Sequence, residues 1–269
     1  MGDAGGPGGS AARLNEQVRG AYDVTAAMWA DGPERMYASA ARALLASPGV
    51  RVAGRRVLDL GAGTGVAAAA ALASGARSVV SADVSVGMLR RCPARTNPVA
   101  ADATALPFRD GCFDLVVAAF SLSHLPDIVA GLTEARRVAP GLAASSFAPA
   151  WTHPAKAAVD EALRTFGYRP PGWYVTFKRD TEPRTGDPAA LAGFAAAAGF
   201  TGARVRAITV ATGLSTPAQL AGWRLGMAHI APFMRSLDAT RQAAARSAAE
   251  FALTGADPLE VSMLVLTAG

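Results

Sequence analysis

Residues Val57–Gly65 read VLDLGAGTG, an apolar run that ends in three glycines on alternate positions, Gly61, Gly63 and Gly65. A short run of Val and Leu followed directly by glycines is typical of a buried strand that ends in a tight turn. Glycine is needed where the backbone takes a positive φ or where another group approaches closely. The stretch therefore predicts a ligand cradle at the carboxyl end of a parallel strand, where open α/β sheets bind their ligands.

Short apolar runs alternate with helical segments on both sides of this stretch. Strands that are apolar on both faces and separated by helices are typical of a doubly wound, mostly parallel sheet. We therefore expect an α/β fold with a seven-stranded sheet. The predicted strands lie at residues 56–60, 78–83, 98–101, 113–119, 142–147, 205–211 and 261–266.

The second half of the chain differs in composition, with Pro, Gly and aromatic residues between its helical segments. Residues 169–187 predict a loop of this composition. Residues 215–255 predict a helical lid insertion of two helices, because long insertions at the mouth of a sheet are usually functional. The expected divisions are a flexible Gly-rich tail at 1–17, a helical cap at 18–50, a ligand-binding core at 51–150 and the rest of the sheet at 151–269.

The overall composition limits the function classes. Of the 269 residues, 51% are hydrophobic and 17% charged, which predicts a soluble protein with a substantial core. The net charge is +5, but the basic residues are scattered, so we expect no nucleic-acid partner. We expect no membrane partner and a cytoplasmic location, since the sequence shows neither a spanning apolar run nor a secretory pattern at its start. The two cysteines and three histidines lack metal-ligand spacing, so we expect no metal.

The spacing of the glycines narrows the kind of ligand. A dinucleotide fingerprint needs G-x-G-x-x-G, but its third glycine position is Val66 here, and a phosphate loop needs a lysine that this turn lacks. These departures disfavour a nicotinamide-dependent oxidoreductase. Asp83 and Asp102 end the next two predicted strands, where carboxylates can accept hydrogen bonds from ribose hydroxyls and an adenine amine. The pattern therefore favours a nucleoside that carries a substituent other than phosphate.

Several segments in chain order resemble the class I S-adenosylmethionine-dependent methyltransferases, in particular the small-molecule group related to ubiquinone and menaquinone biosynthesis (type 11). They are AYDVTAAMWA at 21–30, VLDLGAGTG at 57–65, SADVSVGML at 81–89 and AADATALPFRDGCFDLVVAAFSLSHLPD at 100–127. The resemblance implies a Rossmann-like methyltransferase fold and S-adenosyl-L-methionine as the cofactor. Two departures are a turn before the fifth strand that is one glycine short, at Pro140-Gly141-Leu142, and Ser123 where the group often has a histidine.

The resemblance also implies which residues contact the cofactor. The glycine turn and the carboxylate that ends the second strand would surround the methionine and ribose parts, and residues after the second and third strands would hold the adenine. A tyrosine near the N-terminus would close over the cofactor, and a phenylalanine after the fourth strand would lie near the sulfonium. The implied cofactor residues are Tyr22, Gly61, Ala62, Gly63, Asp83, Val84, Met88, Asp102, Ala103 and Phe120.

Three further polar residues keep alternative interpretations. Asp59 would either contact the cofactor or hold backbone amides of the glycine turn, and the sequence favours neither. His124, after the fourth strand, and His229, in the predicted lid, are the candidate catalytic bases, because histidine titrates nearest to neutral pH. A single histidine is more often structural than catalytic, so both also have a structural interpretation.

The favoured function is methyl transfer to a small, largely apolar acceptor in bacterial specialised metabolism, by a monomer or homodimer. An RNA, DNA or protein acceptor is disfavoured, because residues 119–122 lack the motif such enzymes carry after the fourth strand. The alternative is a natural-product cyclase of the same fold that binds S-adenosylmethionine without transferring methyl. A stripe of Leu220, Trp223 and Met227 is expected to pack on the sheet. The candidate walls of an acceptor pocket are Trp151, Trp173, Tyr174, Trp223 and Phe233.

Overall fold

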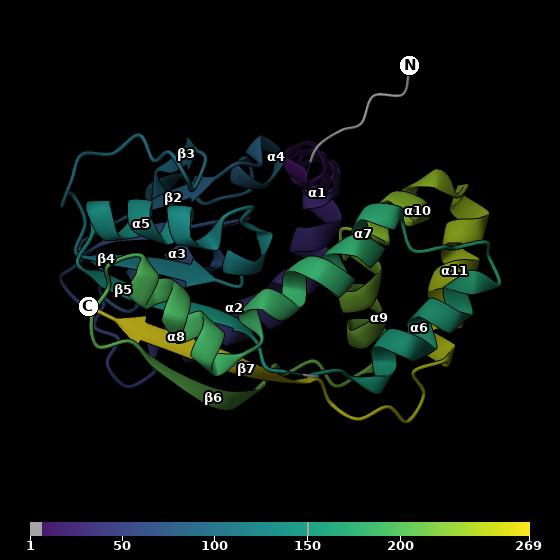
Figure 1. Cartoon of the computed structure of the whole chain (residues 1–269). Helices are drawn as coiled ribbons and strands as arrows, with labels where there is room; N and C mark the ends of the chain where they lie inside the picture. Colours follow the sequence, from purple (N-terminus) through teal and green to yellow (C-terminus); the bar gives the residue numbers. More distant parts are fainter. Residues whose placement is uncertain (1–6, 150) are drawn as a thin grey trace, which may run out of the picture.

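The computed structural model describes residues 7–149 and 151–269 of the chain. Within these residues the strands form one seven-stranded sheet in the order β3-β2-β1-β4-β5-β7-β6 (Figure 1). The strands are β1 (Arg56–Leu60), β2 (Ser78–Asp83), β3 (Pro98–Ala100), β4 (Leu115–Ala119), β5 (Gly141–Phe147), β6 (Arg204–Ala211) and β7 (Glu260–Ala268). β1 to β5 run parallel, whereas β7 runs antiparallel to its neighbours β5 and β6. The predicted doubly wound, mostly parallel sheet is confirmed.

Helices connect the strands and continue beyond the sheet. Several begin at an aspartate that caps the first turn: Asp127, Asp187 and Asp238 each accept a hydrogen bond from a backbone N–H three residues later. The helices are α1 (Pro7–Asp31), α2 (Pro33–Leu45), α3 (Val66–Ala73), α4 (Val86–Leu89), α5 (Ile128–Val138), α6 (Pro154–Arg164), α7 (Gly172–Thr176), α8 (Pro188–Ala197), α9 (Pro217–Leu225), α10 (Ala231–Ser236) and α11 (Ala239–Phe251). Short helical turns are η1 (Ala94–Thr96), η2 (Leu122–His124), η3 (Phe177–Thr181) and η4 (Glu182–Thr185).

Alternate residues of the central strands point into two separate cores. Val57 of β1 and Val117 of β4 belong to the core that includes residues of α2 and α3. Leu58 and Val116, the neighbouring residues, belong to the core that includes residues of α5 and α8. All four side chains are fully buried, which explains why these strands read as continuous apolar runs.

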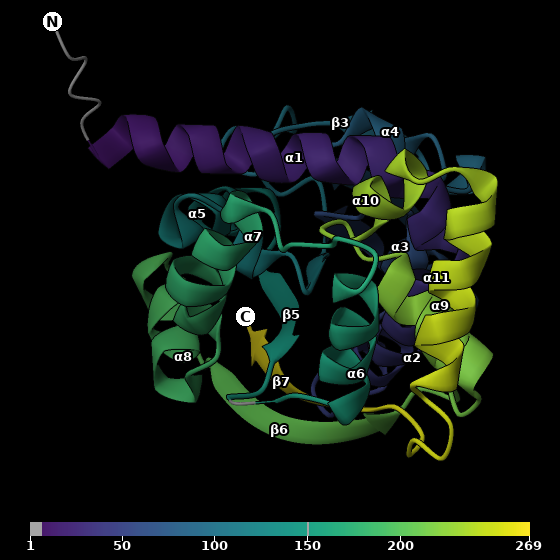
Figure 2. The same ribbon diagram turned by 90° about the vertical axis from the view of Figure 1, so that its right-hand side faces the viewer.

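The N-terminal helix differs from the predicted tail. α1 begins at Pro7, so residues 7–17 are helical, and residues 1–6 lie outside the described residues. Proline suits the first turn of a helix, and the Ala, Arg, Leu, Glu and Gln residues that follow are strong helix formers. Figure 2 shows α1 lying across one end of the molecule, where it contacts α2, α4, α7, α9 and α10. The expectation of a flexible tail is therefore wrong for residues 7–17.

Residues 169–187 are helical over most of their length, and the prediction of a loop is wrong there. α7, η3 and η4 follow one another from Gly172 to Thr185. Pro171 is the N-cap of α7, where a missing N–H breaks no helical hydrogen bond, and Lys178 pairs with Glu182 one turn further on. Proline and glycine at a helix boundary thus gave the sequence a loop-like composition.

The segment 215–255 forms three helices, α9, α10 and α11, rather than the two expected. Gly226 ends α9, and α10 is a separate short helix with Pro232 in its first turn. Together with α6 these helices lie beyond one end of the sheet (Figure 1, right), and α11 contacts both α6 and α9. None of the helices in the described part of the chain is long and apolar enough to cross a membrane.

Candidate active site

The glycine turn after β1 is shaped by the protein's own backbone. Gly61, Gly63 and Gly65 have φ angles of 69°, 55° and 82°, which residues with a side chain rarely adopt. A Cβ on Gly61 would lie 2.3 Å from the Cβ of Ser121, whose hydroxyl donates a 2.7 Å hydrogen bond to the Leu60 carbonyl. A Cβ on Gly63 would meet no atom within 4 Å. The chain that follows β4 therefore crowds Gly61, whereas Gly63 faces open space that a ligand can fill.

Asp83, at the end of β2, fastens this turn. Its Oδ2 accepts a hydrogen bond from the Gly63 N–H at 2.8 Å, and its Oδ1 accepts one from the Ser85 N–H at 2.7 Å. Burial raises the pKa of Asp83, and the two N–H donors oppose that rise. Because each carboxylate oxygen can accept a second hydrogen bond, Asp83 retains acceptors for ribose hydroxyls.

Asp59, inside β1, has a structural position. Its Oδ2 accepts a 2.9 Å hydrogen bond from the N–H of Ala68 in the first turn of α3, so it caps that helix from a distance. The residue is 1% exposed and is not part of the cleft lining. Burial raises its pKa to about 7, and its Oδ1 has no hydrogen-bond partner within the described residues. The geometry therefore favours a structural role, but the backbone amide that Asp59 holds is that of Ala68 in α3 and not one of the glycine turn.

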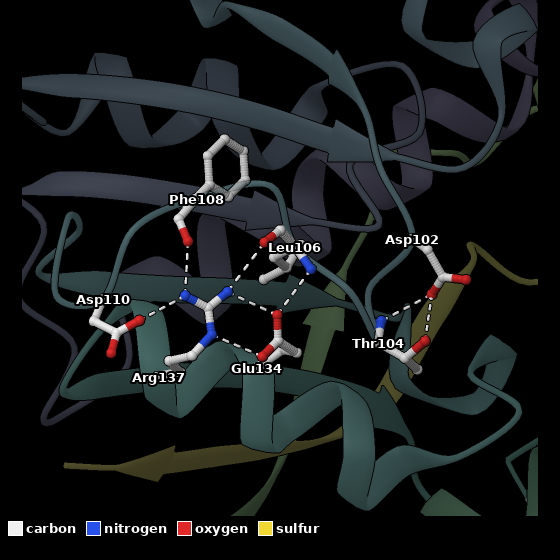
Figure 3. A network of polar contacts seen from close by, with 7 residues as sticks. All are labelled: Asp102, Thr104, Leu106, Phe108, Asp110, Glu134 and Arg137. Atoms are coloured by element: carbon white, nitrogen blue, oxygen red, sulfur yellow. Dashed lines mark hydrogen bonds and ion pairs between the residues drawn. The ribbon is translucent and has the colours of Figure 1, made fainter.

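The loop after β3 is fixed by a polar network on α5 (Figure 3). Arg137 donates a 3.0 Å hydrogen bond to the Leu106 carbonyl and pairs with Glu134 at 2.7 Å. Glu134 in turn accepts a 2.8 Å hydrogen bond from the Leu106 N–H. At the start of the loop, Oδ1 of Asp102 accepts 2.8 Å hydrogen bonds from both the N–H and the hydroxyl of Thr104. The network therefore fixes the loop at Leu106, and a separate turn made by Thr104 fixes the side chain of Asp102.

These elements surround a cleft of about 400 Å³ at the carboxyl ends of β1, β2 and β4. Its volume, and its apolar walls with a few polar groups, are typical of cofactor sites. Met88, which is 2% exposed, supplies an apolar wall, and Gly63 leaves room beside Asp83. The residues present therefore fit an adenosine-containing cofactor, and contact with that cofactor stays a prediction for each of them. The lining includes all ten predicted cofactor residues, Tyr22, Gly61, Ala62, Gly63, Asp83, Val84, Met88, Asp102, Ala103 and Phe120.

A carboxylate that the sequence reasoning missed ties α1 to the cleft. Oδ1 of Asp23 accepts 2.7 Å hydrogen bonds from the Ser85 hydroxyl and the Gly87 N–H, both at the start of α4. A Cβ on Gly87 would lie 2.4 Å from the Asp23 carbonyl oxygen, so the two segments touch backbone to backbone. This contact places the preceding residue, Tyr22, in the cleft lining. The sequence signal that could have indicated Asp23 was its position directly after Tyr22 in the segment 21–30.

A smaller cavity of about 70 Å³ adjoins the cleft and is called the aromatic cavity below; the two share Tyr22, Tyr37, Phe120 and His124. Phe120, directly after β4, has a φ of 56°, which is uncommon outside glycine. Its ring contacts those of Tyr37 and Phe147, with centroid distances of 5.4 and 4.6 Å. Phe120 therefore belongs to the wall between the cleft and the aromatic cavity.

The aromatic cavity gathers residues from both halves of the chain. Phe233, a fifth expected wall, is not in its lining, because its ring packs on Tyr168 with a centroid distance of 5.3 Å. Met227 and Trp223 both line the cavity. Trp223 also belongs, with Leu220, to the core that includes Val57 and Val117 of the sheet, and Met227 packs against that core. The expected stripe is therefore part of the sheet's core, and two of its residues also face the cavity. The expected walls that do line the cavity are Trp151, Trp173, Tyr174 and Trp223.

His124 lies where the two cavities meet. Its ring stacks on that of Phe177 with a centroid distance of 4.7 Å and meets the edge of Tyr22 at 5.5 Å. Its Nδ1 is buried and has no hydrogen-bond partner within residues 7–149 and 151–269. Burial lowers the pKa of His124 to about 4, so the imidazole is neutral at physiological pH. A neutral ring with an unused nitrogen is the form that can take a proton from a ligand.

The other two histidines have different surroundings. His229 lines the aromatic cavity but not the cleft, and its ring stacks on Tyr174 with a centroid distance of 3.6 Å. Burial, with the nearby charges of Arg224 and Lys178, lowers the pKa of His229 well below its usual range. His153 caps α6, since its Nδ1 accepts a hydrogen bond from the Ala155 N–H. In the described part of the chain, no group of three or more His, Cys, Asp or Glu residues is placed to hold a metal ion.

Comparisons with known proteins agree with this geometry. Residues 58–141 match a family model described as a methyltransferase domain. The chain is 44% identical over 129 residues to a demethylmenaquinone methyltransferase of Mycolicibacterium vanbaalenii, covering 47% of this chain and 54% of that protein. It is 41% identical over 162 residues to one of Beutenbergia cavernae, covering 58% of this chain and 65% of that protein. The chain thus spans between half and two thirds of the length of these relatives.

Solved structures share the fold at low identity. The [4+2]-cyclase SpnF is 20% identical with a TM-score of 0.50, covering 84% of this chain and 79% of that one. A Haemonchus contortus phosphoethanolamine N-methyltransferase, solved with phosphomonomethylethanolamine and S-adenosylhomocysteine, is 16% identical with a TM-score of 0.51. That match covers 85% of this chain and 51% of the other. At these identities the likeness concerns the fold alone.

Proposed function

We propose that this chain, which carries a class I S-adenosylmethionine-dependent methyltransferase domain, transfers methyl from that cofactor to a small, largely apolar acceptor bound in the aromatic cavity. The domain and the cofactor class rest on the match at residues 58–141 and on relatives that are methyltransferases by name. Those relatives act on a demethylmenaquinone, and only part of their length is matched. The acceptor, and its place in bacterial specialised metabolism, therefore belong to the proposal.

One observation carries this proposal: the cleft and the aromatic cavity meet at a shared wall. Tyr22, Phe120 and His124 line both spaces, so a cofactor in one and an acceptor in the other would face each other there. Holding two reactants in line in this way can lower a barrier by roughly 7–11 kcal/mol. The cofactor, when bound, supplies an electrophilic methyl group on a sulfonium.

The residues at the shared wall have distinct tasks under this proposal. The hydrogen bonds from Gly63 and Ser85 to Asp83 fix the shape of the glycine turn, and this preformed turn orients the cofactor. Tyr22 and Phe120 exclude water with their rings. Neutral His124 takes the proton of an acceptor hydroxyl at its unpartnered Nδ1, a step that contributes typically 10²–10⁴-fold to such reactions.

Calorimetric titration of the purified protein with S-adenosylhomocysteine tests the part of the proposal that concerns the cofactor. We expect saturable binding, and about tenfold or greater weakening by Asp83→Ala, because the ribose loses charge-assisted hydrogen bonds. Asp257→Ala, at an exposed aspartate, is the matched control and should bind normally. Absence of saturable binding by the wild-type protein would contradict the proposal.

Mass spectrometry of candidate acceptors after incubation with isotopically labelled cofactor tests the transfer itself. A methyltransferase adds one labelled methyl group to the acceptor. A cyclase that only binds the cofactor, the alternative for this fold, rearranges its substrate without any change in mass. If the substrate is converted but its mass does not change, methyl transfer is refuted and the cyclase function takes its place.

A further inference from the structure

The aromatic cavity contains every lysine of the chain. Only two of the 26 Lys and Arg residues are lysines, Lys156 and Lys178, and both line this cavity, from α6 and η3 respectively. Arginine is the basic residue everywhere else in the sequence. The ammonium group of lysine differs from the guanidinium of arginine, because it is a compact point charge that can lose its proton when buried. Its restriction to one cavity points to a task at that place.

The positive groups of this cavity differ in whether a carboxylate balances them. Lys178 pairs with Glu182, and Arg224 forms hydrogen bonds of 3.0 and 2.7 Å to the two oxygens of Asp160. Lys156 forms no ion pair with any residue of the described part of the chain. The nearby carboxylates are therefore already engaged, and Lys156 is the cation that a ligand can pair with.

Aromatic rings fix the position of this cation. Nζ of Lys156 lies 3.7 Å from the ring centroid of Trp151 and 5.8 Å from that of Phe147, within the range of cation–π attraction. Trp151 stacks on Phe147 at 4.7 Å, and its indole N–H donates a 3.0 Å hydrogen bond to the Glu260 carbonyl. Phe147 contacts Phe120, at the wall of the cofactor cleft, at 4.6 Å. A row of rings thus leads from that wall to Lys156.

The charge balance at Lys156 favours an anionic ligand. Burial, with the positive charges of Lys178 on η3 and Arg224 on α9, lowers the pKa of Lys156 to about 7. Glu182 on η4 and Asp160 on α6 oppose this fall. A bound carboxylate would raise the pKa again, because an opposite charge stabilises the ammonium. Such a ligand would be bound best below pH 7, where Lys156 is already charged, and less well as the pH rises above that value.

We propose that Lys156 is the specificity-determining residue of the acceptor site and binds a carboxylate at the end of the acceptor opposite the methylated atom. The acceptor class is then a planar, largely apolar carboxylic acid, whose body lies along Phe120, Phe147 and Trp151 and whose carboxylate lies at Nζ. This inference rests on the proposed function, because it assigns the aromatic cavity to the acceptor.

Benzoate and benzamide are suitable probes, since they have the same shape and differ in charge. Reductive methylation with ¹³C-formaldehyde labels the two lysines, so NMR follows Lys156 directly, and Lys156→Met assigns its signal. With S-adenosylhomocysteine present, we expect benzoate to shift the Lys156 signal saturably. We also expect benzoate to bind at least about tenfold more tightly than benzamide. Lys156→Met should abolish this preference in a competition measurement. Arg246→Met, at an exposed arginine of α11, is the matched control and should retain it.

Equal binding of the two probes to the wild-type protein, or a benzoate preference that survives in Lys156→Met, would overturn the proposal. Lys156→Gln repeats the test with a polar neutral side chain in case the methionine variant folds poorly. Calorimetry with S-adenosylhomocysteine separates the two levels of inference. A protein that binds the cofactor product but does not prefer benzoate refutes the role of Lys156 alone, whereas failure to bind the cofactor product refutes the proposed function.

Discussion

Gly61 and Gly63 both have a positive φ, but their surroundings differ. Gly61 is packed against Ser121, which follows the neighbouring strand, so its missing side chain allows β1 and β4 to continue side by side. Gly63 has open space where a Cβ would be, and its N–H is held by Asp83. The first glycine therefore serves the fold and the second serves the cleft.

Alanine substitutions should separate these two tasks. Gly61→Ala should reduce the free energy of unfolding by roughly 2–4 kcal/mol, because it adds a steric clash to backbone strain. Gly63→Ala should cost only about 1–2 kcal/mol in stability, but should weaken binding of S-adenosylhomocysteine. Urea denaturation and calorimetry check the pair. In Gly61→Ala/Ser121→Gly the clash is relieved, so part of the stability should return; equal losses for both single variants would contradict the assignment.

Asp59 should make stability depend on pH. Its pKa is about 7 in the folded protein and about 4 in an unfolded chain, so folding favours the protonated form. The resulting stabilisation is complete below pH 4 and is lost as the pH rises through 7, by up to about 4 kcal/mol. Asp59→Asn cannot ionise, and its carbonyl oxygen can still accept from Ala68. We therefore expect the difference in unfolding free energy between the wild-type protein and this variant to change across pH 4–7; a constant difference would refute the assignment.

Two helices fix the position of cleft residues through carboxylates that bind the backbone of another segment. α5 carries Glu134 and Arg137, which hold the loop containing Asp102 (Figure 3). α1 reaches across the molecule and is fastened to α4 through Asp23 (Figure 2). In both cases a carboxylate accepts a hydrogen bond from a backbone N–H of another segment. Tyr22 directly precedes Asp23, whereas Asp102 lies four residues before Leu106.

Asp23→Ala should loosen α1 from α4. We expect the KM for S-adenosylmethionine to rise about tenfold while kcat changes little, because two charge-assisted hydrogen bonds that position Tyr22 are lost. Steady-state kinetics measure this split. Asp31→Ala, at an exposed aspartate at the end of the same helix, should behave like the wild-type protein. An unchanged KM in Asp23→Ala would show that the contact is not needed for cofactor binding.

At the scale of the whole molecule, the shared wall is built from segments that are distant in the sequence. Tyr22 comes from α1 and His124 from η2, and their rings meet edge to face. Phe177 of η3 supports the wall from the side of the aromatic cavity, because its ring stacks on His124, whose Nδ1 has no partner within the described residues. No one of these segments buries the imidazole by itself. The burial that lowers the pKa of His124 to about 4 is therefore a property of the assembled fold.

His124→Gln should lower kcat by about 10²–10⁴-fold if the acceptor must lose a proton. Because the pKa of His124 is about 4, the wild-type kcat at saturating acceptor should show no change near pH 6.5 and should fall only as the pH approaches 4. A pH–rate profile measures both. His153→Asn keeps a capping acceptor and lines neither cavity, so it should leave the rate unchanged. A rate that falls with a midpoint near 6.5 in the wild-type protein would exclude His124 as the base.

The cleft proposed for the cofactor could be predicted from the sequence for a physical reason. Most of its predicted residues lie at or directly after the end of a strand or in one short turn, and parallel strands bring their carboxyl ends to the same edge. Tyr22 of α1 and Met88 of α4 are the exceptions. Local order along the chain therefore predicted the sheet, the glycine turn and the carboxylates at the ends of β2 and β3. The family resemblance added the other predicted residues of the cleft lining, such as Tyr22, Met88 and Phe120. Helical segments with proline or glycine at their boundaries, at 7–17 and 169–187, were misjudged because composition there resembles a tail or a loop.

The tertiary structure decided how the aromatic cavity is assembled, although the sequence predicted four of its walls, Trp151, Trp173, Tyr174 and Trp223. Lys156 and Phe177 carried no local motif, Phe233 proved to pack elsewhere, and Trp223 turned toward the cavity. Their positions depend on how α1, α6, α7 and α9 pack together beyond the sheet. Such packing follows from side-chain contacts between distant segments, which periodicity along one segment does not encode. Sequence patterns therefore predicted the cleft at the ends of the strands, whereas the arrangement of the aromatic cavity depends on how the helices pack together.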